Sequence, residues 1–184
     1  AFVVGRYHLR QGTEDGRKLA GELFQKATQL DPGYALPYAY LAVLYSHGGG
    51  YLAGGRIQTR MKAREWATKA LELDASSAEA HTALGWLELA DWDWRGAEQE
   101  FKRAIELNPN YATAHTWFAQ FLNGLRRYDE ALFHARRAME LEPADPGVVT
   151  HAAIPFWASG RVDEAMAYWQ KVLDLEPSYW AAHS

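Results

Sequence analysis

Small and apolar residues recur along the chain at fixed spacings. Five segments begin with alanine, carry a small or apolar residue seven positions on, and carry leucine ten positions on. These spacings place the residues on one face of an α-helix, so each segment is expected to be helical. The step between the last four segments is 34 residues, and the step between the first two is 43 residues. The five segments begin at Ala20, Ala63, Ala97, Ala131 and Ala165.

Proline marks the end of nearly every segment. A residue before proline disfavours the α conformation, so the helices are expected to stop there. The prolines are Pro32, Pro109, Pro143 and Pro177, and Ala75 takes the place once.

A further helix is predicted before each segment, marked by a pair of interior residues of which the second is small. The pairs are Val4-Gly5, Leu41-Ala42, Leu84-Gly85, Phe118-Ala119 and, in a weaker form, Ala152-Ala153.

A 34-residue pair of helices with these positions resembles the tetratricopeptide repeat. The resemblance covers nearly the whole chain and implies an all-α, right-handed superhelical solenoid of antiparallel helix pairs. We expect about five repeats in one continuous domain over 1–184, with 180–184 starting a further helix. The amino-acid sequence from Asp91 to His115, in the middle of the chain, is also similar to that of repeat arrays in bacterial multidomain regulators. The expected repeats are 1–34, 35–77, 78–111, 112–145 and 146–179.

Both ends of the chain look like cuts through a longer array. The first predicted helix fits best if it began before Ala1, and Trp180 to Ser184 reads as the first turn of another helix. Cut ends would leave apolar helix faces open, because a repeat buries its apolar face against its neighbours. We therefore expect self-association through an array end.

The repeat over 35–77 holds about nine extra residues, which fall within 46–60 between its two helices. We expect a flexible loop there, with partner contact as the alternative function. The loop contains His47-Gly-Gly-Gly50, a pattern found in some hydrolase oxyanion loops. The chain has no Gly-x-Ser-x-Gly nucleophile motif, and no Gly-Lys-Ser or Gly-Lys-Thr follows the glycines. No catalytic or phosphate-binding residue is therefore predicted, and the chain is not expected to be an enzyme.

Composition narrows the class of partner. The formal net charge is −4 and no basic tract is present, which argues against nucleic acid and anionic membranes as partners. The chain has no cysteine and no apolar run of the roughly 20 residues that span a bilayer. The cytoplasm is the default expectation for such a chain, and no cofactor is predicted. His81, His115 and His183 share a repeat position, but no histidine pair at i, i+4 completes a metal site, so packing roles are expected.

Eight tryptophans invite separate interpretations. Trp94 and Trp169 occupy positions at which the family has core residues, so both are expected in the core, and Trp66 is expected to pack as well. Trp92 stands where a turn would normally carry glycine and is expected to be exposed. Trp86, Trp117 and Trp157 lie on the first helices of their repeats, away from the interior pair.

The first helices of stacked repeats line a concave surface, and helical spacing names the residues on it. We predict a module that binds a peptide or protein segment in this groove. Among these helices Arg6 is the only cation that would face the groove, so a clamp for a terminal carboxylate is not expected. Two alternatives stay open: a ligand-sensing regulatory domain of a larger signalling or transcription-regulating protein, or tryptophans that only pack. The predicted binding residues are Tyr40, Val43, Trp86, Trp117, Gln120, Asn123, His151 and Trp157.

Overall fold

The computed structural model describes residues 1–47 and 55–176, and within these ranges the chain forms ten α-helices and no strand. The predicted all-α helical-repeat fold is confirmed. The helices form two compact units, unit 1 over Ala1–Pro109 and unit 2 over Asn110–Ser184. Unit 1 contains α1 (Phe2–Arg10), α2 (Glu14–Leu30), α3 (Ala35–Ser46), α4 (Gly55–Leu73), α5 (Ala78–Ala90) and α6 (Trp94–Leu107). Unit 2 contains α7 (Ala112–Gly124), α8 (Tyr128–Leu141), α9 (Pro146–Ala158) and α10 (Val162–Leu175).

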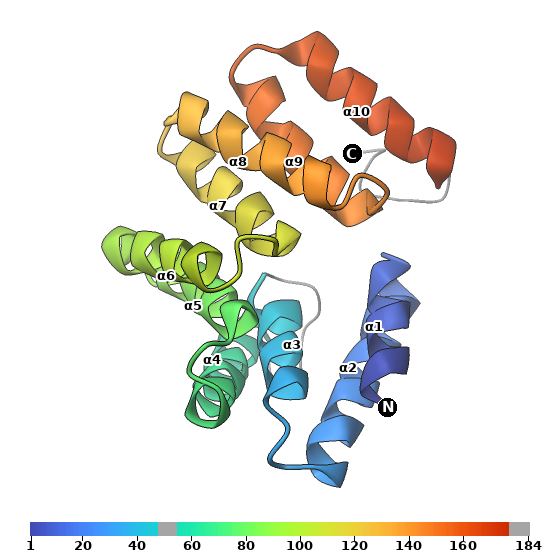
Figure 1. Cartoon of the computed structure of the whole chain (residues 1–184), viewed down its shortest axis with the longest axis vertical. Coiled ribbons are helices and arrows are strands. Elements are labelled where there is room, and N and C mark those ends of the chain that lie inside the picture. The colour runs from blue at the N-terminus through green and yellow to red at the C-terminus, as the bar shows by residue number, and fades with distance from the viewer. Residues whose placement is uncertain (48–54, 177–184) are drawn as a thin grey trace. The chain divides into compact units, whose positions relative to one another are not determined.

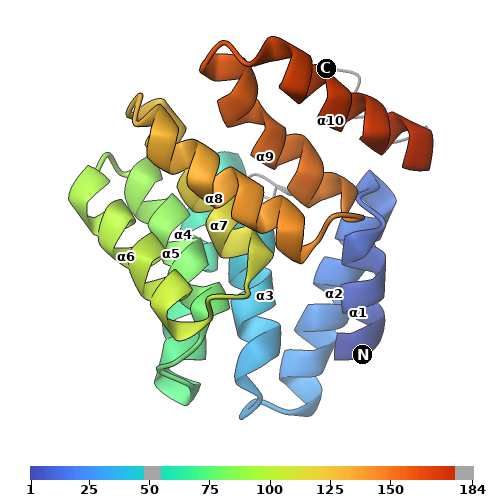
Figure 2. The same ribbon diagram turned by 45° about the horizontal axis from the view of Figure 1, so that its top comes forward.

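Consecutive helices pack as pairs within each unit. In unit 1 the pairs are α1 with α2, α3 with α4 and α5 with α6, and in unit 2 they are α7 with α8 and α9 with α10 (Figures 1 and 2). First helices also pack on one another, α3 on α5 and α7 on α9, which is the contact expected between adjacent repeats. The boundary between the units follows Pro109, near the predicted junction of the third and fourth repeats. Continuity of one domain across that junction stays a prediction.

The small residues of the repeat allow helices to approach closely. All five alanines that begin the repeated segments are completely buried. A Cβ added to Gly5 would lie 2.7 Å from the Phe24 ring, and one added to Gly85 would lie 2.8 Å from the Phe101 ring. In the next repeat alanine takes the place of both Gly85 and Phe101, at positions 119 and 135. The size of the small residue therefore follows the size of the side chain that faces it.

The turns between paired helices share one backbone feature. A residue with positive φ stands at the same repeat position in four turns, and glycine is the residue that takes this conformation without strain. The four are Gly12 (φ 66°), Trp92 (φ 66°), Arg126 (φ 58°) and Gly160 (φ 85°). At the other end of each repeat, the prediction that helices stop before proline is confirmed at Asp31, Asn108 and Glu142. These three cap residues have extended φ of −142°, −140° and −133°.

The extra residues predicted within 46–60 fall between two helices, since α3 includes Ser46 and α4 begins at Gly55. The early turns of α4 are held by Arg60, whose Nη1 donates to the Ala90 carbonyl at the end of α5 over 3.0 Å. The rest of that loop, with the glycines of the oxyanion-like pattern, lies outside the described residues, as do His183 and the expected helix start at 180–184.

The prediction that Trp94 lies in the core is wrong, because its side chain is 40% exposed. It is the first residue of α6 and contacts the exposed Trp92 ring at the turn, with ring centroids 5.7 Å apart. Trp169 packs partly buried against the core of unit 2, and its indole N–H donates to the Thr150 carbonyl over 3.0 Å.

Within the described ranges, no helix combines the length and the apolar character needed to cross a membrane.

Candidate partner-binding surfaces

The binding residues predicted in unit 1 are mainly engaged in packing. Tyr40 on α3 lies among the rings of Phe2 and Phe24, with centroids 5.3 and 5.5 Å away, and the Arg6 guanidinium lies 5.5 Å from its ring centroid. Val43, one turn further, packs partly buried against the small cluster that joins α3, α4 and α5. These two side chains connect helices of unit 1, and each keeps only part of its surface exposed.

Trp86 on α5 connects this helix with the end of α3 and with α6. Its ring meets His47, at the end of α3, with centroids 4.3 Å apart, and it meets Phe101 of α6 edge-on at 6.4 Å. His47 was predicted only as part of a loop. Its approach to Trp86 follows from the packing of α3 on α5, and no pattern within either helix indicates it.

Unit 2 brings three of the predicted residues into direct contact. The ring centroids of Trp117 on α7 and His151 on α9 lie 5.1 Å apart, and the ring planes meet at 70°. Gln120 Nε2 donates a hydrogen bond to the His151 carbonyl over 3.4 Å. His151 Nδ1 lies 2.8 Å from the Gly147 carbonyl oxygen. A carbonyl can only accept, so Nδ1 carries the proton and this bond orients the ring on α9.

Asn123 and Trp157 lie about two turns further along the same two helices. The two residues are 34 positions apart and occupy the same repeat position, as Trp117 and His151 do. Trp157 is 57% exposed, although a tryptophan ring offers a large apolar surface. The Asn123 side chain is half-buried, and its Oδ1 atom has no hydrogen-bond donor among the described residues. We call the surface of Trp117, Gln120, Asn123, His151 and Trp157 the α7/α9 face.

The histidines at the shared repeat position are held by the second helix of their own repeat. His81 Nδ1 lies 2.6 Å from Glu100 Oε2, and His115 Nδ1 lies 2.9 Å from His134 Nδ1. Both partners stand 19 residues after the histidine, and Trp169 likewise stands 19 residues after Thr150. Burial, and then the nearby His115, lower the pKa of His134 to about 4. His134 was not singled out from the sequence, and only these contacts between the two helices of a repeat reveal the offset of 19 residues.

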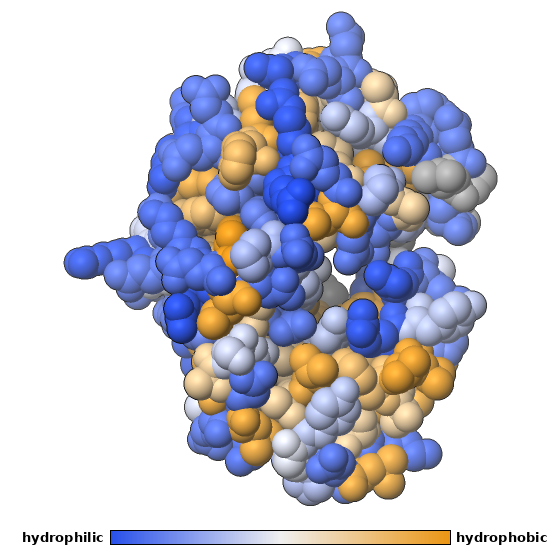
Figure 3. All heavy atoms as spheres, viewed as in Figure 1, coloured by the Kyte–Doolittle hydropathy of each residue, from blue (hydrophilic) through white to orange (hydrophobic). Residues whose placement is uncertain are grey.

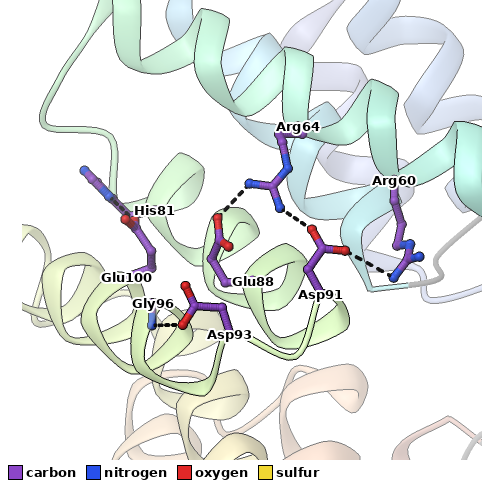
Figure 4. A network of polar contacts seen from close by, with 8 residues as sticks. All are labelled: Arg60, Arg64, His81, Glu88, Asp91, Asp93, Gly96 and Glu100. Carbon is purple, nitrogen blue, oxygen red and sulfur yellow. Dashed lines mark hydrogen bonds and ion pairs between the residues drawn. The ribbon is translucent and has the colours of Figure 1, made fainter.

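A charged network joins the long α4 to the end of α5 in unit 1 (Figure 4). Arg64 donates to Glu88 over 2.6 Å and to Asp91 over 2.8 Å, and Arg60 lies 3.8 Å from Asp91. Hydrogen bonds to both carboxylates raise the pKa of Arg64 against the opposing effect of its burial, which is the largest single influence. The arginines complement the negative end of the α5 helix dipole, so the network secures the join between two repeats.

Possible metal ligands do not cluster in the described part of the chain. Within residues 1–47 and 55–176, no group of three or more histidine, aspartate or glutamate side chains is arranged to hold a metal ion. In Figure 3 hydrophobic residues form small, separate groups among hydrophilic ones on the face in view. The most exposed large apolar side chains include Val3 and Tyr7 on α1, Trp92 at a turn, Phe133 on α8 and Trp157 on α9.

Comparison with known proteins agrees with the helical-repeat fold. A family model described as tetratricopeptide repeat matches residues 100–133. The type IV pilus assembly protein PilF of Pseudomonas aeruginosa is 33% identical over 84 residues. That match covers 46% of this chain and 32% of PilF, so the chain spans about a third of the curated relative. The solved structure of P. aeruginosa PilF shares 25% identity with a TM-score of 0.61, covering 78% of this chain and 61% of that one.

Two more distant structures show the fold alone. A thermophilic TPR protein of Thermus thermophilus has a TM-score of 0.72 at 20% identity, covering 99% of this chain and 93% of that one. A chain of the APC/C hetero-tetramer Cut9–Hcn1 has a TM-score of 0.66 at 19% identity, covering 92% of this chain and 32% of that one. The family model therefore supports the repeat over residues 100–133, and the solved structures share the helical-repeat fold.

Proposed function

We propose that this array of tetratricopeptide repeats is a protein-interaction module in which the α7/α9 face binds a segment of a partner protein. Tetratricopeptide proteins are generally interaction modules that carry partners rather than transform them, and repeat arrays present extended binding surfaces. PilF is named for the assembly of a protein structure, which supports a protein as the class of partner here as well.

The observation that carries the proposal is the exposed Trp157 ring beside a fixed set of polar and aromatic groups. Contacts between α7 and α9 hold Trp117, Gln120 and His151 in place, so the surface is formed before a partner arrives. A preformed surface loses little conformational entropy on binding. Tryptophan is enriched among residues that dominate binding energy, because one rigid side chain buries a large area.

The polar groups of the face suit an extended segment. Gln120 and Asn123 carry amides that both donate and accept hydrogen bonds, which is what the backbone of an extended peptide requires. Asn123 Oδ1 receives no hydrogen bond within the described residues, and an unsatisfied buried acceptor costs about 1–3 kcal/mol. A backbone N–H of the partner would relieve this cost after a small rotation of the amide. Recognition would then combine one apolar anchor with backbone hydrogen bonds.

The test compares two exposed aromatic residues on different helices of unit 2. Trp157 on α9 is 57% exposed and Phe133 on α8 is 65% exposed, so either can be replaced without opening the core. A photoreactive phenylalanine at position 157 should cross-link a partner protein in cells, and the same residue at position 133 should not. Trp157→Ala should weaken binding of the identified partner at least about tenfold, the size of a hot-spot loss, and Phe133→Ala should leave it unchanged.

Equal cross-linking at the two positions, or unchanged affinity of the Trp157→Ala variant, would remove the α7/α9 face as the binding site. A chain that cross-links no protein at all but gains thermal stability with small metabolites would favour the ligand-sensing alternative. Thermal unfolding of both variants provides the control, because neither substitution should lower the melting temperature appreciably.

A further inference from the structure

Two tryptophans stand next to each other on the turn between α5 and α6, in unit 1. Trp92 is 76% exposed and Trp94 is 40% exposed. Their ring centroids lie 5.7 Å apart and the ring planes meet at 64°, so a face of one ring adjoins an edge of the other. Trp92, at this exposure, buries little area and contributes little to the hydrophobic stabilisation of unit 1.

The backbone conformation at position 92 is unfavourable for tryptophan. Its φ of 66° lies in the left-handed region, where a bulky residue is uncommon and strained. Two of the three other equivalent turns use Gly12 and Gly160, which adopt this conformation readily, and the third carries Arg126. Trp92 therefore places a large apolar ring in solvent from a position that glycine would serve better. A side chain that strains the backbone and does not fill the core is best explained by contact with another molecule.

The surroundings of the two rings indicate the chemistry of that molecule. Figure 4 shows Glu88, Asp91 and Asp93 near this turn. The Asp93 backbone N–H donates to the Glu88 carbonyl over 2.9 Å. Arg64 and Arg60 engage Glu88 and Asp91. The Asp93 carboxylate is exposed and caps α6 by accepting the Gly96 N–H at Oδ1 over 2.8 Å. The faces of tryptophan rings attract cations, and a nearby carboxylate strengthens that attraction.

We infer that the Trp92–Trp94 pair is a second binding site, which takes an arginine side chain from a basic segment of a partner protein. The guanidinium group lies flat over one indole face and is bordered by the second ring. The Asp93 carboxylate supplies the opposite charge. Arginine is favoured over lysine, because its planar, weakly hydrated group stacks on aromatic rings. Arg95, exposed one residue after Trp94, is the cation of this chain that would compete for the same place.

The experiment uses the chain labelled with 5-fluorotryptophan and fluorine NMR, with the lines of Trp92 and Trp94 assigned from Trp92→Gly and Trp94→Phe. The probe is a short peptide of alternating glycine and arginine at physiological salt, beside the same peptide with neutral citrulline in place of arginine. We expect the arginine peptide to shift the Trp92 and Trp94 lines saturably. Trp92→Gly should weaken binding about fivefold, the loss expected for one cation–π contact, without lowering the melting temperature.

Asp93→Asn separates charge from structure, because asparagine is as good a helix cap as aspartate but carries no charge. This variant should bind the arginine peptide more weakly with its melting temperature retained, and Arg95→Ala should bind it more tightly. Equal shifts with the citrulline peptide would overturn the proposal in favour of an uncharged, proline-like ligand. Shifts confined to the other tryptophans, or undiminished affinity of Trp92→Gly, would overturn it as well.

Discussion

Acidification should destabilise unit 2 through the His115–His134 pair. The two Nδ1 atoms lie 2.9 Å apart, so one ring donates a proton and the other accepts it, and there is no room for a second proton between them. Burial and the neighbouring His115 lower the pKa of His134 from 6.5 to about 4, although Glu130 acts in the opposite direction. A histidine in the unfolded chain titrates near 6.5. Below that pH the unfolded chain takes up a proton that the folded unit rejects, so stability falls as the pH drops from about 6.5 to about 4.

The size of the effect follows from proton linkage. A pKa of 6.5 in the unfolded chain and about 4 in the folded one gives a loss of at most about 2 kcal/mol between about pH 7.5 and about pH 5. The His134 ring keeps part of its surface in water, and solvent screening reduces such effects. We therefore expect a loss of about 1 kcal/mol, which is large enough to shift a denaturant midpoint measurably.

Guanidinium unfolding at the two pH values measures this loss, with His134→Gln as the matched variant. Glutamine can hydrogen bond to His115 but does not titrate, so pH effects from the carboxylates are common to both proteins and cancel. The wild type should lose about 1 kcal/mol more than His134→Gln on acidification. Equal losses in both proteins, or an NMR titration that places the His134 pKa near 6.5, would refute the reasoning.

Two further predictions concern close packing and the exposed first helix. Gly85→Ala should destabilise the chain by about 1–3 kcal/mol in thermal unfolding, since the new Cβ would lie 2.8 Å from Phe101. Gly124→Ala, with nothing within 4 Å of its Cβ, should be neutral or stabilising, and a similar loss in both would contradict the packing account. Val3 and Tyr7 on α1 expose most of their side chains, so they are candidates for a self-association surface. The double variant Val3→Glu/Tyr7→Glu should weaken the self-association measured by sedimentation. A wild-type chain that stays monomeric at high concentration would contradict this prediction.

Local patterns in the sequence determined the helices and their ends. The small residues at Ala97 and Ala131 mark one face of a helix over spacings of a few residues, and that face is buried as predicted. Pre-proline residues such as Asn108 stop the helix through a clash within two adjacent residues. Trp92 was expected to be exposed because its turn normally carries glycine, and its left-handed backbone confirms the basis of that expectation. Signals of this kind depend only on residues that are close in the sequence, so they can be recognised without knowledge of the fold.

Only the tertiary structure decided which side chains are presented and which are packed. Trp94 occupies a position typical of the core, yet it lies exposed against Trp92, because the turn and not the repeat interior surrounds it. Arg60 in α4 donates to the Ala90 carbonyl at the end of α5, a contact across 30 residues. Tyr40 lies among rings from two other helices, and its role in binding stays a prediction.

The pairing of His115 with His134 and the contact of Trp117 with His151 likewise join residues from different helices. The repeat period tells which residues occupy equivalent positions, but equivalent positions in this chain carry different side chains. Burial, hydrogen bonding and pKa depend on the particular neighbours that the second helix and the next repeat supply. The sequence by itself therefore determined the architecture of this protein, and the packing between helices determined the chemistry of its surface.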